Sequence, residues 1–334
     1  MTTAPLTRQS QLLLLGLLTT FFFINFIARV VLAPLLPVIE ADLGLSHTGA
    51  GSFFMLMAIG YAAGLFLSGY ISSRLTFRQT IALAAVALGF AFFFVAASRN
   101  LWAIRIGIVL IGIAAGIYLP SGITMITASI SPADWGKAIA IHELAPSIAY
   151  FSAPLIVEGL LLFLSWQGVL ALIGFLPVIL GLAFFRLGQG GDSRGDAPTL
   201  GNIRHMTEKP AFWIMVVLFS LAIATSMGLY SMMPLYLVAE RGIDRGTANT
   251  LVGLSRLPVL IVTFFAGWIT DRFGPKPVIA AVIFFNGLTA ILLGALPREW
   301  VTLMVFLQPA LSVCFYPAGF MILSRIVPSG ARNL

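Results

Sequence analysis

The chain has 334 residues, of which 59% are hydrophobic and 9% are charged, with a formal net charge of +7. Soluble domains carry roughly 25% charged residues, so this chain has too little polar surface to cover a globule in water. In a soluble protein the positive charge would suggest nucleic-acid binding. Here the basic residues lie in short segments between long apolar runs, which indicates membrane topology. We therefore expect the lipid bilayer as a partner and no nucleic acid.

Ten apolar runs are each long enough to cross a bilayer, which takes about 20 residues. They lie near residues 11–37, 48–72, 78–98, 101–129, 137–163, 167–187, 211–238, 248–270, 276–296 and 300–325. The polar stretch 188–210 has the composition of a flexible linker. We predict an all-α integral membrane fold with six helices in residues 1–187, a cytoplasmic linker at 188–210 and four helices in 211–334.

The distribution of Lys and Arg predicts the orientation of these spans. With the N-terminus in the cytoplasm, twelve of the nineteen basic residues fall in inside segments, four in outside loops and three within spans. Cytoplasmic loops carry the excess of positive charge, which favours this orientation. The first run is too long for a signal-peptide core, so we interpret it as a retained span. The prediction is a multi-pass protein of the cytoplasmic (inner) membrane.

Segments of the first half recur in the second half at a nearly constant offset. The matched pairs are Gly69–Arg78 with Gly267–Lys276, Pro34–Glu40 with Pro234–Glu240, and Tyr118–Gly122 with Tyr316–Gly319. Offsets this similar in three separate places relate spans 1–4 to spans 7–10 in the same orientation. Parallel halves of this kind are related by an axis along the membrane normal and are typical of alternating-access transporters.

The basic turns after spans 2 and 8 carry the most specific pattern in the chain. The later turn runs Gly-x-x-x-Asp-Arg-x-Gly-x-Lys and contributes Gly267, Asp271, Arg272, Gly274 and Lys276. The earlier turn keeps Gly69, Arg74 and Arg78, whereas Ser73 replaces the acid and Thr76 replaces the second glycine.

This pattern resembles the loop motif of the major facilitator superfamily, and the resemblance covers essentially the whole chain. It implies a transporter whose spans 1, 4, 7 and 10 line a central cavity, with spans 2, 5, 8 and 11 beside it. We expect the two glycines that open the motif copies to let helices approach closely. The motif residues would then act as a conformational latch, with a weaker latch in the first half because Ser73 lacks a charge.

The family usually has twelve spans, whereas ten are found here. By the repeat, counterparts of spans 5 and 6 would follow Leu334, near positions 334–384. We therefore expect a C-terminally truncated product or a fragment in which spans 11 and 12 are absent. A complete protein of ten spans is the alternative.

Three arginines lie within spans, where an ionisable side chain is costly and is therefore a functional candidate. One of them, Arg105, is shallow enough to snorkel or to pair with Glu158. Arg29 lies in span 1 and Arg256 in span 8, and the resemblance places them on opposite bundles facing one cavity. A guanidinium grips carboxylate or phosphate through two parallel hydrogen bonds, which predicts an anionic substrate. The other candidate substrate-binding residues are polar or aromatic groups of the cavity-lining spans: Asn25, Tyr118, Tyr230, Gln308 and Tyr316.

His142 and Glu143 in span 5 are the candidates for proton coupling, because histidine titrates near neutrality and burial disfavours a charged carboxylate. Adjacent helical positions point about 100° apart, so we expect one of the two at most to face the cavity squarely. Pro146 and Pro154 are expected to bend the same span.

The sequence contains no Walker loop, no metal-ligand cluster and no nucleophile–base arrangement, so we predict neither an enzyme nor a cofactor. We predict a secondary active transporter of a small organic solute, with an anionic substrate and proton coupling, that works by alternating access. Two alternatives stay open: a drug or neutral-solute exporter of the same fold, and a truncated membrane protein that does not transport. We expect a monomer, because the two halves complete one another within one chain.

Overall fold

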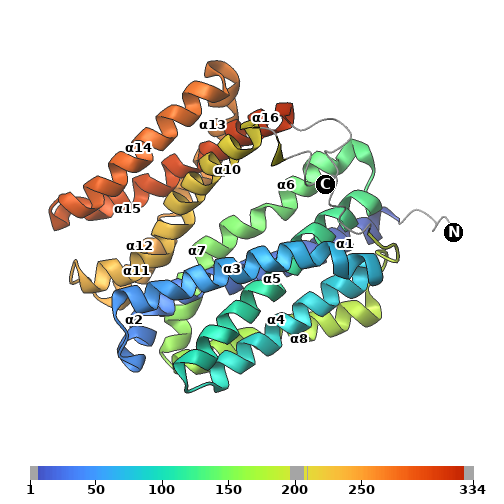
Figure 1. Cartoon of the computed structure of the whole chain (residues 1–334), viewed down its shortest axis with the longest axis horizontal. Coiled ribbons are helices and arrows are strands. Elements are labelled where there is room, and N and C mark those ends of the chain that lie inside the picture. Colours follow the sequence, from blue (N-terminus) through green and yellow to red (C-terminus); the bar gives the residue numbers. More distant parts are fainter. Residues whose placement is uncertain (1–6, 196–206, 209, 327–334) are drawn as a thin grey trace. The chain divides into compact units, whose positions relative to one another are not determined.

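The computed structural model describes residues 7–195, 207–208 and 210–326. The chain forms two compact units, Met1–Pro198 and Thr199–Leu334, called unit 1 and unit 2 below. Within the described residues, ten stretches are long and apolar enough to span a membrane, six in unit 1 and four in unit 2 (Figure 1). This confirms the predicted all-α membrane fold. The predicted linker residues 196–206 and 209 lie outside the described residues.

Unit 1 holds spans 1–6. Its helices are α1 (Arg8–Val30), α2 (Leu32–Leu43), α3 (His47–Arg74), α4 (Phe77–Ala97), α5 (Leu101–Ser129), the 3₁₀ turn η1 (Pro132–Asp134), α6 (Trp135–His142), α7 (Leu144–Leu161) and α8 (Trp166–Leu187). The helices that follow short loops begin with polar caps. Ser46, Thr76, Asn100 and Ser165 each accept a hydrogen bond from a backbone N–H of the first turn, which fixes where α3, α4, α5 and α8 start.

Unit 2 holds spans 7–10. Its helices are α10 (Pro210–Ile223), the π-helical turn η2 (Ala224–Gly228), α11 (Leu229–Ala239), α12 (Arg245–Leu254), α13 (Leu257–Phe273), α14 (Pro275–Ala295), α15 (Arg298–Val313) and α16 (Phe315–Ile326). Asp244 caps α12 by accepting from the Thr247 N–H at 2.9 Å. Hydrogen bonds from Thr247 hold the pKa of the Asp244 carboxyl below its usual range. The cap is therefore complete above the ordinary pKa of aspartate and is lost as pH falls through the lowered value.

Among the described residues, a π-helical turn interrupts span 7, and four other spans are broken into two helices by one rule. The first helix ends four residues before a proline: at Val30 before Pro34, His142 before Pro146, Leu254 before Pro258 and Val313 before Pro317. A proline has no N–H for the carbonyl four residues back, and its ring crowds that carbonyl. The breaks therefore have a cause that is visible in the sequence.

Span 5 shows both the use and the limit of this rule. The predicted bend at Pro146 appears as the break at Glu143, between α6 and α7. The predicted bend at Pro154 does not produce a break, because α7 continues through this residue to Leu161.

The tightest contact in unit 1 joins α3 and α5 through four glycines. A Cβ atom on Gly64 would lie 2.2 Å from the carbonyl oxygen of Ile113, and one on Gly60 would lie 2.3 Å from that of Val109. Gly112 and Gly116 face α3 with equally little room. The absence of side chains lets the two backbones touch, as small residues do in membrane helix pairs. The corresponding positions in unit 2, 198 residues on, hold Pro258, Val262, Ala310 and Cys314.

We predict that Gly64→Ala destabilises the protein by about 1–3 kcal/mol, because the added methyl group would meet backbone that can move only if α3 and α5 separate. Gly159→Ala in α7 is the matched control, since no heavy atom lies within 4 Å of its added Cβ. The measurement is the thermal unfolding midpoint of the purified protein in detergent. Equal midpoints for the two variants would contradict the glycine contact.

Candidate functional site

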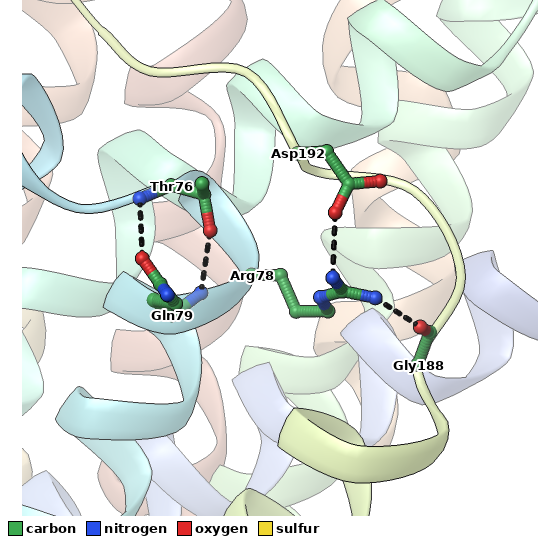
Figure 2. Close-up of polar contacts among 5 residues, drawn as sticks. All are labelled: Thr76, Arg78, Gln79, Gly188 and Asp192. Atoms are coloured by element: carbon green, nitrogen blue, oxygen red, sulfur yellow. Dashed lines mark hydrogen bonds and ion pairs between the residues drawn. The ribbon is translucent and has the colours of Figure 1, made fainter. Parts of the chain in front are cut away.

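The first copy of the loop motif lies at the junction of α3 and α4, and Arg78 is its most engaged residue. The Arg78 guanidinium donates to the Gly188 carbonyl at 2.7 Å and pairs with the Asp192 carboxylate at 2.6 Å (Figure 2). Thr76 and Gln79 form a reciprocal capping box at the start of α4. Thr76 therefore starts α4 by side-chain capping, at the position where the other motif copy has a glycine.

The segment 188–195 continues from α8 and binds back onto this junction. Its carbonyls at Gly191 and Ser193 accept hydrogen bonds, each of 3.0 Å, from the N–H groups of Arg78 and Phe77. The N–H of Gly195 donates to Ser72. These bonds satisfy helix-terminal groups that have no partner within their own helices. Residues 188–195 of the predicted linker are therefore hydrogen-bonded to the junction of α3 and α4 in this structure.

The remaining motif residues of the first copy make fewer contacts. The Ser73 hydroxyl donates to the Tyr70 carbonyl of its own helix at 2.8 Å, so it does not replace the missing acid. Arg74 is exposed and has no hydrogen bond or ion pair to any described residue. Arg78 of α4, with Asp192 after α8, thus supplies the ion pair at this turn.

The second motif copy, between α13 and α14, is built differently. Gly274 has φ = 82° and connects the two helices directly, a conformation that favours glycine. Arg272 lies over the Trp268 ring at 5.3 Å. Asp271 and Lys276 are exposed and pair with no described residue. No heavy atom lies within 4 Å of a Cβ placed on Gly267, so the close helix approach expected at this glycine is not made among the described residues and stays a prediction.

The span 5 pair lies beside span 1 and span 4. His142, the last residue of α6, is fully buried. Its Nε2 lies 3.1 Å from the Tyr118 hydroxyl of α5, and that hydroxyl donates to the Leu18 carbonyl of α1 at 2.6 Å. The Phe22 ring stacks on the imidazole with ring centres 4.3 Å apart and planes 4° apart. Tyr118, expected among the substrate-binding residues, thus contacts a proton-coupling candidate.

Glu143 diverges from His142, as expected for neighbouring helical positions. Its side chain is 50% exposed, and its carboxylate lies 3.5 Å from Nδ1 of the buried imidazole. The pair stands at the break between α6 and α7. The carboxylate is therefore open to its surroundings while the imidazole is enclosed.

Arg29 and Asn25 lie on α1 near its break. The Arg29 guanidinium is 4.0 Å from the centre of the Tyr61 ring of α3 and 4.9 Å from that of Phe26. Asn25 donates to the Ala115 carbonyl of α5 at 2.9 Å. Tyr61 was not among the predicted site residues. A search of span 2 for aromatic residues near the level of Arg29 could have found it.

Three predicted substrate-binding residues of unit 2 meet at one small cavity. Tyr230, Arg256 and Gln308 line it, and its volume of about 10 Å³ is enough for about one water molecule. Arg256 is buried at the α12–α13 break, with its guanidinium 4.7 Å from the centre of the Tyr230 ring. Arg29 belongs to unit 1 and Arg256 to unit 2, so the cavity that they are expected to share remains a prediction.

Gln308 and Tyr316 both hold the π-helical turn of span 7. Gln308 donates to the Thr225 carbonyl at 2.6 Å, and the Tyr316 hydroxyl lies 3.0 Å from that of Ser226. Gln308 also bonds Ser312, which donates to Asn286 of α14 at 2.8 Å. Sequence reasoning missed Asn286 and Ser312, although polar residues inside spans 9 and 10 were a usable signal. Within the described residues no group of three His, Cys, Asp or Glu side chains could hold a metal ion.

We predict that Arg78→Ala releases segment 188–195. The amides of residues 77, 78 and 195 should then exchange hydrogen roughly fivefold faster, since a partly exposed pair of this kind contributes about 1 kcal/mol. Hydrogen-exchange mass spectrometry of the full chain measures this. Arg74→Ala is the control, because Arg74 is exposed. Equal exchange in both variants would show that Arg78 does not hold the segment.

Comparison with known proteins agrees with this architecture. The chain is 25% identical over 316 residues to the membrane sensor protein UhpC of Escherichia coli (strain K12), covering 86% of this chain and 70% of UhpC. It is 23% identical over 307 residues to the gallate transporter of Pseudomonas putida, covering 80% of this chain and 68% of that protein.

The fold is similar to the crystal structure of a bacterial homolog of the human lysosomal transporter Spinster in an inward-facing, unoccupied conformation. The TM-score is 0.82 at 16% identity, with 98% of this chain and 78% of the other covered. The sequence profile of the Major Facilitator Superfamily matches residues 18–334. The match extends over nearly the whole chain, and the protein belongs to this superfamily.

Proposed function

We propose that the protein is a proton-coupled secondary transporter of a small organic anion. In this proposal two bundles, residues 1–187 and 211–334, alternate about the linker at 188–210 in the cytoplasmic membrane, with the N-terminus in the cytoplasm. The observation that supports this proposal is the environment of two arginines. Arg29 and Arg256 each lie inside a span with the guanidinium against a tyrosine ring.

An arginine held in this way is suited to an anion. The cation–π attraction to the ring draws on the charge of the guanidinium, and a guanidinium carries five N–H donors in a planar fork. Those donors match the two oxygens of a carboxylate or phosphate. Removal from water strengthens the attraction, and Arg256 is only 8% exposed.

The broken helices support the same reading. Arg29 precedes the end of α1 by one residue, and Arg256 stands directly before α13. In secondary transporters, spans interrupted near the middle of the membrane place helix ends at the substrate, and the N-terminal ends favour anionic groups. The start of α13 would therefore add a favourable dipole to the charge of Arg256.

The proton would be carried by His142 with Glu143. An imidazole at the C-terminal end of α6 gains from the negative end of the helix dipole when it is protonated. Glu143 places a carboxylate 3.5 Å from that ring. Both residues lie at the break of span 5, where α6 and α7 could change their relative angle.

The motif turns would act as latches that hold one conformation. The residues proposed for this role are Gly69, Arg74, Arg78, Gly267, Asp271, Arg272, Gly274 and Lys276. The Arg78–Asp192 pair supports it in unit 1. In unit 2, Asp271 and Lys276 are exposed at the end of the bundle, where they can meet a partner that comes close in one conformation.

The related proteins favour two possible functions of the same site. The similarity to a gallate transporter supports transport of an anion. The similarity to a membrane sensor protein supports a second candidate, in which the chain binds a solute without carrying it across. Export of a lipophilic drug is a third outcome that the substrate experiment can reveal.

We predict that small carboxylates or phosphates raise the thermal unfolding midpoint of the purified protein. Arg29→Lys and Arg256→Lys should each weaken ligand affinity by about 1.5–3 kcal/mol, because lysine keeps the charge and loses the two-pronged bond. Arg105→Lys is the matched control, since Arg105 also stacks on an aromatic ring, Trp102, at 5.0 Å. Stabilisation by lipophilic cations alone would reject the anion proposal in favour of drug export.

We predict that His142→Gln and Glu143→Gln abolish proton-driven accumulation in proteoliposomes but retain exchange of labelled for unlabelled solute. Neither variant can pass a proton between the two side chains, whereas exchange needs no net proton movement. Binding without exchange in the unmodified chain would favour the sensor candidate. Unchanged accumulation in both variants would exclude this pair as the proton carrier.

A further inference from the structure

Tyr118 has contacts that a substrate-binding role does not explain. Its hydroxyl is buried between the Leu18 carbonyl and the His142 imidazole, at 2.6 Å and 3.1 Å. A tyrosine hydroxyl has one proton to donate, and a carbonyl oxygen can only accept. The proton of Tyr118 therefore points to Leu18, and the hydroxyl oxygen offers a lone pair to His142.

This arrangement determines which ring nitrogen of His142 carries hydrogen. If the Tyr118 oxygen is the acceptor, a hydrogen bond across the 3.1 Å contact requires Nε2 to be the N–H donor of the neutral ring. The second nitrogen, Nδ1, then keeps its lone pair. It is buried, has no hydrogen-bond partner among the described residues, and has the Glu143 carboxylate 3.5 Å away.

We propose that Tyr118 is a positioning residue that holds His142 in the Nε2–H form, so that Nδ1 is the single atom at which the proton is accepted. An arriving proton forms an N–H bond at Nδ1 and makes the ring cationic, with the charge facing Glu143. When the proton leaves, the Nδ1 lone pair is restored. The inference rests on the proposed proton coupling. It assigns Nδ1 of His142 as the atom that accepts the proton and Tyr118 as the residue that holds the ring in the required tautomer.

Phe22 completes the arrangement from α1. Its ring covers one face of the imidazole at 4.3 Å in a nearly parallel stack. The stack limits rotation of the imidazole. The π face of Phe22 also attracts the imidazole once the imidazole is protonated. Leu18 and Phe22 are both on α1. Through Phe22 and through Tyr118, the imidazole that would bind the proton in span 5 is therefore linked to span 1.

The other titratable groups around α6 leave this assignment unchanged. Among the described residues, Tyr118 of α5 and Glu143 are the ionisable side chains in contact with the imidazole. Asp134 of η1 pairs with Lys137 at 3.2 Å. The carboxylate of α7, Glu158, is about four helical turns further along the chain, and the charged residues of α1, Arg8 and Arg29, lie at its two ends.

The first experiment is ¹⁵N NMR of the full chain, labelled at histidine and reconstituted in nanodiscs. The sequence has three histidines, so the double variant His47→Gln/His205→Gln leaves His142 as the sole signal. When the imidazole is neutral, we expect Nε2 to carry the hydrogen and Nδ1 to be unprotonated. Tyr118→Phe removes the acceptor of the Nε2–H hydrogen bond. The ratio of the Nε2–H tautomer to the Nδ1–H tautomer should then fall by roughly five- to tenfold, because this factor corresponds to the net free energy of one hydrogen bond.

Tyr70→Phe is the control, because Tyr70 is 52% exposed and its loss removes one hydroxyl away from His142. A neutral ring with hydrogen at Nδ1, or an unchanged tautomer ratio in Tyr118→Phe, would overturn the inference.

Uptake in proteoliposomes as a function of pH separates this inference from the proposed function. If Tyr118 positions the proton acceptor, its replacement by Phe should shift the pH of half-maximal uptake, while Tyr70→Phe should not. A pH-dependent uptake that Tyr118→Phe leaves unshifted would reject the positioning role and keep the transporter. Uptake that is independent of pH in the unmodified chain would reject proton coupling itself, and the positioning role with it.

Discussion

The interior of a bilayer offers no water, so every backbone N–H and C=O inside it needs a partner within the protein. This constraint explains both the long helices and the chemistry at their interruptions. Where span 7 widens into a π turn, Gln308 binds the Thr225 carbonyl. At the breaks of spans 8 and 10, the N–H groups of Arg256 and Cys314 reach carbonyls three residues back. Interruptions are therefore where polar side chains gather, and the candidate site is built from them.

The two units follow one repeated plan with different helix packing. In unit 1, backbone contact between glycines locks α3 against α5, and α3 presents Tyr61 to Arg29. In unit 2 the equivalent positions hold larger residues, and the span that corresponds to α3 is broken before Pro258. Next to this break lie the buried Arg256 and a small cavity. The glycine contact of unit 1 and the polar site of unit 2 therefore fall on corresponding spans of the repeat.

Much of the fold followed from residue types alone. Ten apolar runs and the polar stretch between the sixth and seventh gave the ten spans with end points within a few residues. The breaks of spans 1, 5, 8 and 10 could also have been found, because in each of them the first helix ends four residues before a proline. Proline was not sufficient, however, since α5 and α7 continue through Pro120 and Pro154. Whether the carbonyl left without a donor ends the helix depends on the neighbours that pack against it.

The sequence by itself determined membrane insertion, the ten spans of this chain, the parallel repeat and the residue types present at the candidate site. These follow from hydropathy and spacing, which act along the chain. The tertiary structure decided which of those residues touch. It joined Tyr118 of span 4 to His142 of span 5 and Leu18 of span 1, and it bound Arg78 to Asp192, 114 residues away. Such contacts depend on helix rotation and close packing in three dimensions. The sequence pattern of one helix does not show which residues of another helix it will contact.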